Sequence, residues 1–264
     1  MKEKLIKVLN SYSKRANDRK DKYGLKPRPL SKKEIGVIIE ALTLSNLSQD
    51  TFKIFEEERL DKLLLRLLAN EVRRGTFPSS YIKAVGLTRY VTDDLKSDYL
   101  SPGKALKLLK DMKGGAASVE LVKLLKEGYY IDEIIEILKD TVLINKDEFN
   151  LICELIDDID EIKELLKSWA EAEFAEGWTL ADEYQGLTIK VGDNITTGHL
   201  SPSKEANSRT DQPLHALHIM EGREDEEDFL ERLGKLKANN KNIFLVAGEA
   251  LGEVSSRKSA TYTM

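Results

Sequence analysis

The sequence has almost no cysteine and no long apolar run. Cys153 is the only thiol among 264 residues, so the chain cannot form an internal disulfide or hold a metal cluster with its own cysteines alone. No apolar stretch approaches the roughly 20 residues that a membrane-spanning helix needs. The charged N-terminal segment also lacks the unbroken apolar core of a signal peptide. These absences predict a cytoplasmic protein without a membrane partner.

Charge is plentiful but unevenly spread. Charged residues make up 33% of the chain and hydrophobic residues 41%, which is typical of a globular protein with one large or two modest domains. Residues 1–30 hold ten Lys or Arg against three Asp or Glu, although the whole chain has a net charge of −5. This basic arm is a candidate contact for nucleic acid or an acidic partner, through Lys14, Arg15, Arg19 and Lys20. A solvated terminal helix is the alternative interpretation.

The first two thirds of the chain read as helical. Apolar residues recur there at three- and four-residue spacing, which predicts amphipathic helices. Ser31 and Glu34 have the spacing of a capping box, and Pro78 and Pro102 occupy favoured first positions of helices. The predicted helices cover residues 2–20, 31–42, 50–73, 78–96, 102–113, 118–127, 131–144, 147–156 and 159–176. Many helices joined by short links favour an all-α solenoid of antiparallel hairpins.

The pattern changes after Trp178. Residues 187–191 alternate apolar and polar side chains as a strand does, and residues 243–247 form a short apolar run typical of a buried strand. Helices are predicted between them at residues 214–220 and 229–238. This alternation indicates a separate α/β domain. The predicted division is a helical domain (1–168), a linker (169–181) and a second domain (182–264).

A polar cluster follows the last predicted strand. Gly248 and Gly252 are expected to break the strand, and Ser255 is a suitable N-cap for a following helix. With Ser256, Arg257 and Lys258, this turn would gather backbone N–H groups, two hydroxyls, two cations and the positive end of a helix dipole. Such a point suits a small carboxylate or phosphate ligand. A surface turn without a ligand is the competing interpretation.

The histidines give a weaker signal. His215 and His218 have the i, i+3 spacing of half a metal site, but the sequence offers no third ligand beside them. We therefore predict packing or capping roles for both residues and no metal site in this chain.

Five stretches carry a resemblance to a known family. They are SYIKAVGL at 80–87, LSPGKALKLLKDMKGG at 100–115, LLKSWAEAEF at 165–174, LSPSKEANSRTDQPLHAL at 200–217 and SSRKSAT at 255–261. In this order they make almost the whole chain similar to the N-terminal region of bacterial aconitase B, also called aconitate hydratase 2. The resemblance implies a multidomain α plus α/β fold: a HEAT-like helical solenoid followed by an incomplete aconitase swivel domain of β/β/α type.

The resemblance also implies an activity. Family members isomerise citrate to isocitrate through cis-aconitate in the tricarboxylic acid cycle, or handle 2-methyl analogues, with a 4Fe–4S cluster held by later domains. They can bind mRNA when the cluster is lost, and the HEAT-like part takes part in self-association. On this similarity Arg209, Ser255, Ser256 and Arg257 are the expected tricarboxylate-binding residues. Ser255 is the expected catalytic base, assisted by nearby cations and by the cluster iron.

Several departures from the family pattern count against activity of this chain alone. Cys153 cannot replace the three thiolates of the family's cluster, so we expect no cofactor in this chain. Gly198 and His199 stand where the family has an acidic residue, and Val254 replaces a glycine. The chain also ends at Met264, within the expected swivel domain. Two alternatives remain: a truncated relative that binds protein or RNA without catalysis, and a split enzyme whose second polypeptide supplies the cluster.

Overall fold

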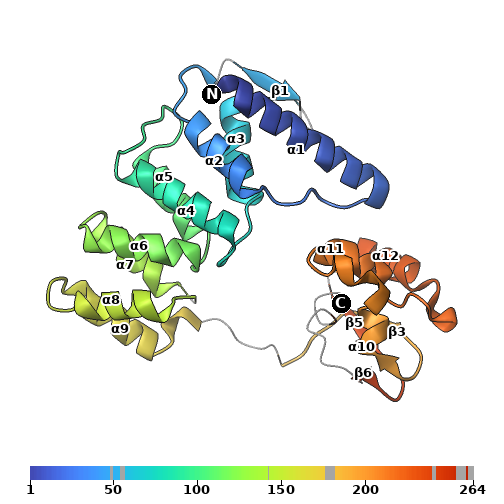
Figure 1. The fold of residues 1–264 in the computed structure, drawn as a ribbon. Helices are drawn as coiled ribbons and strands as arrows, with labels where there is room; N and C mark the ends of the chain where they lie inside the picture. Colours follow the sequence, from blue (N-terminus) through green and yellow to red (C-terminus); the bar gives the residue numbers. More distant parts are fainter. Residues whose placement is uncertain are drawn as a thin grey trace. The chain divides into compact units, whose positions relative to one another are not determined.

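The computed structural model describes residues 1–47, 50–53, 57–141, 143–175, 182–239, 242–253 and 260. The chain divides into two compact units, one of residues 1–22 and 26–179 and the other of residues 23–25 and 180–264 (Figure 1). It is mostly helical, with small two-stranded sheets. Among the described residues, no helix is both long and apolar enough to cross a membrane.

The first unit is built from helices and one short hairpin. Its helices are α1 (Lys2–Tyr23), α2 (Lys32–Ala41), α3 (Leu60–Asn70), α4 (Pro78–Val91), α5 (Pro102–Lys110), α6 (Ala116–Lys126), α7 (Ile131–Lys139), α8 (Lys146–Glu154) and α9 (Glu161–Ala170). Helix α4 packs against α2, α5 and α6, and α7 packs against α9, so these helices are covered mainly by neighbours close in sequence (Figure 1). One continuous apolar core results, rich in leucine and isoleucine.

Local capping signals explain where several of these helices start. The Ser31 hydroxyl accepts the Glu34 N–H at 3.4 Å, and the Glu34 carboxylate accepts the Ser31 N–H at 2.8 Å, which confirms the capping box. Pro78 is the first residue of α4. Ser101 caps α5 through the Lys104 N–H at 3.4 Å. These residues satisfy or remove the N–H groups that have no partner inside the helix.

The predicted helix over residues 50–73 is wrong in its first half. Strands β1 (Thr51–Lys53) and β2 (Glu57–Arg59) pair antiparallel there, with Thr51 opposite Arg59. The helix begins only at Leu60, whose N–H is donated to the Asp50 carbonyl at 2.9 Å. That bond closes the hairpin. In a longer helix the same Leu60 N–H would instead be donated to a carbonyl of the preceding helical turn.

Two glycines, Gly75 and Gly115, lie where two loops between the middle helices meet. The Gly115 N–H is donated to the Leu143 carbonyl at 3.0 Å, and the Ala116 N–H to the Gly75 carbonyl at 3.0 Å. Gly115 has φ 62° and ψ −120°, a conformation that side chains with a Cβ avoid. A Cβ on Gly115 would lie 2.6 Å from the carbonyl carbon of Gly75. Two loops therefore touch backbone to backbone at this point.

The second unit is a small α/β structure. Strand β3 (Leu187–Lys190) pairs parallel with β5 (Ile243–Val246), and β4 (Ile195–Thr196) pairs parallel with β6 (Leu251–Glu253). The helical elements between them are α10 (Thr197–Leu200), η3 (Ser203–Ser208), α11 (Gln212–His215), η4 (Ala216–His218), η5 (Glu224–Glu226) and α12 (Phe229–Asn239). A separate apolar core joins Ile189 and Ile195 to Phe229 of α12.

Two expectations about the last strands need correction. Gly252 does not end the strand region, because it lies inside β6, where its φ of 79° is available to glycine. The predicted strand at Ile243 is confirmed, but it is not a buried one. Phe244 and Val246 are 39% and 43% exposed, because α12 and its neighbours cover one face of the strand in the described residues.

Candidate functional site

The polar turn of Ser255, Ser256 and Arg257 lies outside the described residues. The part of the candidate site that the structure describes is the segment from Thr196 to Glu221, which contains Arg209. Its geometry is built by three local devices, namely a helix cap, a buried histidine and a surface ion cluster.

His199 completes the cap of α10. The Thr196 hydroxyl accepts the N–H groups of Gly198 at 3.2 Å and His199 at 3.4 Å, while His199 Nδ1 accepts the Thr196 N–H at 3.0 Å. Because Nδ1 accepts, the ring proton of the neutral imidazole is on Nε2. Burial, and then the charge of Arg223, lower the pKa of His199, which favours this neutral form. His199 therefore has a structural partner in its own turn.

His215 lies between two serine hydroxyl groups and contacts both. It is 1% exposed, its Nδ1 lies 2.7 Å from Ser208 Oγ, and its Nε2 lies 2.8 Å from Ser201 Oγ. The single hydroxyl proton of Ser208 is donated to the Glu205 carbonyl at 2.8 Å, so Ser208 must accept from His215 Nδ1–H. Nε2 then accepts from Ser201. Burial and the charge of Arg209 lower the pKa of His215, consistent with this neutral tautomer.

Arg209 follows the clamped Ser208 directly. Its side chain is half-buried, and its Nε is shielded from solvent without a hydrogen-bond acceptor among the described residues. A buried donor left unpaired costs about 1–3 kcal/mol. Guanidinium groups bind carboxylates through two parallel N–H bonds and keep their charge at any physiological pH. The donor set at Arg209 therefore fits a carboxylate ligand.

His218 does not share a site with His215. Its Nδ1 lies 2.8 Å from Glu221 Oε2, and its Nε2 lies 3.6 Å from Glu205 Oε2. These three residues place ligand-type atoms within 4.8 Å of one another, a proximity that the i, i+3 spacing could not reveal. The Lys204 ammonium already lies 2.7 Å from Glu221, and a cation would have to compete with it. We assign no metal to this cluster.

Gly248 lies where the loop after β5 meets the loop after β3. The Asp193 carboxylate accepts the Glu249 N–H at 3.1 Å, and a Cβ on Gly248 would lie 1.5 Å from Asp193 Oδ1. Glycine leaves room for that carboxylate, which would have to move aside for any residue with a Cβ.

The four basic candidates on α1 fall into two pairs. Arg15 forms an ion pair with Glu34 at 3.0 Å, and Arg19 is 8% exposed and donates to the Lys26 carbonyl at 2.6 Å. Lys14 and Lys20 are exposed. The arginines thus hold α1 to the rest of its unit, and the lysines are the pair available to a partner.

The chain's own residues do not fit an iron–sulfur cluster. Its only cysteine, Cys153, lies in α8 of the helical unit, where it is half-buried. A cubane cluster requires several thiolates around one point. Cys153 alone therefore cannot hold such a cluster.

The described residues define a two-part chain: a unit of packed helices, followed by a small parallel α/β unit that contains Arg209. Comparison with known protein families shows which family the chain belongs to. Residues 11–175 match the family described as the aconitate B N-terminal domain, and residues 187–264 match the aconitate hydratase 2 N-terminus. The chain belongs to the aconitase B family.

Individual relatives agree over the same range. Aconitate hydratase B of Escherichia coli (strain K12) is 30% identical over 262 residues, covering 96% of this chain and 29% of the relative. The protein of the same name from Pseudomonas aeruginosa is 30% identical over 263 residues, with the same coverage. That of Helicobacter pylori is 29% identical over 256 residues, covering 96% of this chain and 28% of the relative. The chain thus spans less than a third of the length of these relatives.

Proposed function

We propose that this chain is the substrate-binding N-terminal portion of an aconitate hydratase of the B type, acting in the cytoplasm. In this proposal the helical unit is a HEAT-like solenoid and the α/β unit belongs to the swivel domain. The observation that carries it is Arg209, whose buried Nε has no acceptor among the described residues, within a chain matched to the family along both units.

The proposed chemistry divides between two sets of residues. Arg209 binds one carboxylate of citrate or a 2-methyl analogue through its guanidinium group. Ser256 and Arg257 bind a further carboxylate, and Ser255 removes the carbon-bound proton. An unassisted hydroxyl is too weak a base for that step, so the cationic charge of Arg257 has to stabilise the alkoxide. The 4Fe–4S cluster of the family would be supplied by domains or a polypeptide outside this sequence.

Binding of citrate by the purified chain tests this proposal. Isothermal titration with citrate up to about 10 mM should show one saturable site. Arg209→Lys should raise the dissociation constant about 10- to 100-fold, because it removes charge-assisted hydrogen bonds worth about 1.5–3 kcal/mol. Arg59→Lys is the matched control, since Arg59 forms an ion pair with Asp61 in the other unit. Equal binding by both variants would overturn the role of Arg209.

Activity provides a second test. We expect no conversion of citrate by the chain by itself, because Cys153 is its only thiol. Turnover by the purified chain without a partner would contradict this expectation. Co-purification of an iron-containing polypeptide from the native cell would favour the split-enzyme form of the proposal.

A second candidate function is RNA binding through α1. The observation that favours it is the exposure of Lys14 and Lys20 on one basic helix, with no ion pair to either among the described residues. Lys14→Glu with Lys20→Glu should reduce RNA affinity and flatten its dependence on salt. RNA retention that is unchanged by this double variant, or absent at low salt, would remove the candidate. Self-association of the helical unit would be detected in the same samples by sedimentation.

A further inference from the structure

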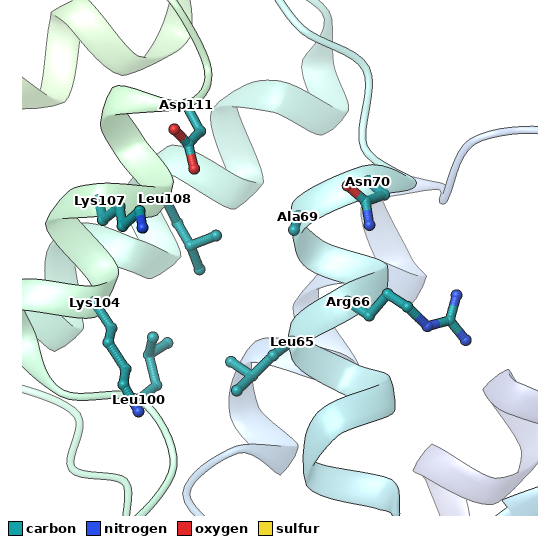
Figure 2. A pocket seen from close by; sticks show the side chains of 9 residues that line it. All are labelled: Leu65, Arg66, Ala69, Asn70, Leu100, Lys104, Lys107, Leu108 and Asp111. Atoms are coloured by element: carbon teal, nitrogen blue, oxygen red, sulfur yellow. The ribbon is translucent and has the colours of Figure 1, made fainter. Parts of the chain in front are cut away.

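An apolar groove lies between α3 and α5 of the helical unit. Its volume is about 400 Å³, and most of its lining comes from Leu65 and Ala69 on one side and Leu100 and Leu108 on the other. Figure 2 shows these side chains facing one another across the gap between the two helices. Leu100 is 1% exposed and forms part of the floor, whereas Leu65 and Leu108 are half-buried. Apolar surface of this kind gains free energy when a ligand removes it from water.

Positively charged side chains outnumber carboxylates in the lining of this groove. Lys104 and Lys107 line the α5 side, and the ammonium group of neither one forms an ion pair or hydrogen bond among the described residues. Arg66 contributes only its stem, since its guanidinium points away from the gap (Figure 2) and binds Glu58 at 2.7 Å. Asp111 at one end is the single carboxylate of the lining. The groove therefore offers two free ammonium groups beside an apolar floor.

The spacing of the cations indicates what kind of ligand fits. Lys104 and Lys107 are three positions apart on a helix, so they project from the same face. Carboxylates spaced by three or four residues on a second helix match this arrangement. Apolar side chains on the same face of that second helix would enter the groove, as in other helix-in-groove complexes.

We propose that the α3–α5 groove is a docking site for an acidic amphipathic helix of a partner protein. One or two large apolar side chains of the partner fill the space over Leu100, and its flanking Asp or Glu residues pair with Lys104 and Lys107. Association is accelerated and oriented by these charges and weakens with added salt. This site does not depend on Arg209, which lies in the other unit, or on tricarboxylate binding.

A displayed library of random twelve-residue peptides, selected on the intact chain, tests the proposal. We expect enrichment of sequences with Asp or Glu flanking Leu, Ile, Phe or Trp at helical spacing. Lys104→Glu with Lys107→Glu should reduce the affinity of the selected peptides at least about tenfold, because two attractive pairs become repulsive. Lys110→Glu with Lys113→Glu is the matched control, with the same change in charge outside the groove, and should leave the affinity within about twofold.

The remaining outcomes overturn the proposal. Selected peptides that bind the Lys104/Lys107 variant as well as the wild type do not use the groove. Enrichment of basic or uncharged peptides contradicts the inferred partner chemistry. If no peptide is enriched, and the Lys104/Lys107 variant instead dissociates a wild-type dimer in sedimentation, the groove's occupant is a second copy of the chain. Thermal melts of both variants establish that the helical unit is folded in each case.

Discussion

Gly115 allows a sharp test of how the helical unit is held together. Its backbone has φ 62° and ψ −120°, and its Cα faces Gly75 so closely that a Cβ would lie 2.6–2.8 Å from three backbone atoms. Alanine at this position is therefore strained in conformation and blocked in space. Two other glycines of the same unit separate these causes. Gly75 has φ 84° but open space around its Cβ position, and Gly36 in α2 has open space and no positive φ.

The magnitudes follow from these environments. A residue with a Cβ at positive φ costs about 1–2 kcal/mol, so Gly75→Ala should lose about that much stability. Gly115→Ala adds an overlap with backbone that cannot rotate away, worth a further 1–3 kcal/mol or so, for a total of about 2–5 kcal/mol. Gly36→Ala should gain about 0.5–1 kcal/mol, because alanine favours a helix interior.

Urea unfolding and thermal unfolding, both followed by circular dichroism, measure the stability of all three variants. With typical values for a unit of this size, Gly115→Ala should lower the melting temperature by roughly 4–20 °C. The expected order of stability is Gly36→Ala, wild type, Gly75→Ala, Gly115→Ala. A Gly115→Ala protein as stable as Gly75→Ala would refute the close contact between the two loops, and one as stable as wild type would refute the backbone conformation as well.

Three further predictions concern buried polar groups. Burial lowers the pKa of Lys83 from 10.5 to about 8, so the folded state carries a costly charge below pH 8. In urea titrations, Lys83→Met should therefore stabilise the folded protein by about 1–3 kcal/mol at pH 7, and this gain should be lost as the pH rises to 10.5. Because the pKa of His215 is lowered in the folded state, the unfolded chain binds a proton first as the pH falls, and stability should drop as the pH passes below 6.5. His215→Asn should therefore make the free energy of unfolding less dependent on pH between pH 7.5 and 5.5. Tyr90 donates to the Ile39 carbonyl at 2.6 Å in the core, and Tyr90→Phe should cost about 1–2 kcal/mol in the same assay, with Tyr81→Phe on the half-buried side of α4 as control.

Local signals in the sequence predicted local structure well. Ser31 with Glu34, and the prolines at positions 78 and 102, fix helix starts through interactions within one turn, and all three starts are confirmed. The hairpin before α3 could not be found in the same way. Its decisive bond joins Leu60 to Asp50, and the apolar residues of 52–59 have a spacing that a helix would also accept. Pairing across a turn competes with helix formation there, and periodicity does not rank the two.

The second unit shows the same limit over longer distances. Its strands at 187 and 243 were predicted from their own residues, but their parallel pairing brings together segments more than fifty positions apart. The Glu226 carboxylate, 4% exposed, accepts the Gly192 N–H at 2.8 Å and joins the end of β3 to the segment before α12. No spacing rule connects these two residues, since their contact exists only after the sheet has formed.

The residue types of the described site could be predicted from the sequence, but the burial and the hydrogen bonds of those residues could not. Arg209 was expected to bind a carboxylate because of its family position, but only the fold shows that its Nε is buried without an acceptor while its neighbour Ser208 is bonded to His215. His199 shows the converse. It stands in a segment where the family has an acidic side chain, and its Nδ1 accepts the Thr196 N–H as the carboxylate of a capping box does. A neutral imidazole with its proton on Nε2 can therefore serve the cap that a carboxylate would serve, so α10 keeps its N-terminal cap without an acidic side chain in this segment.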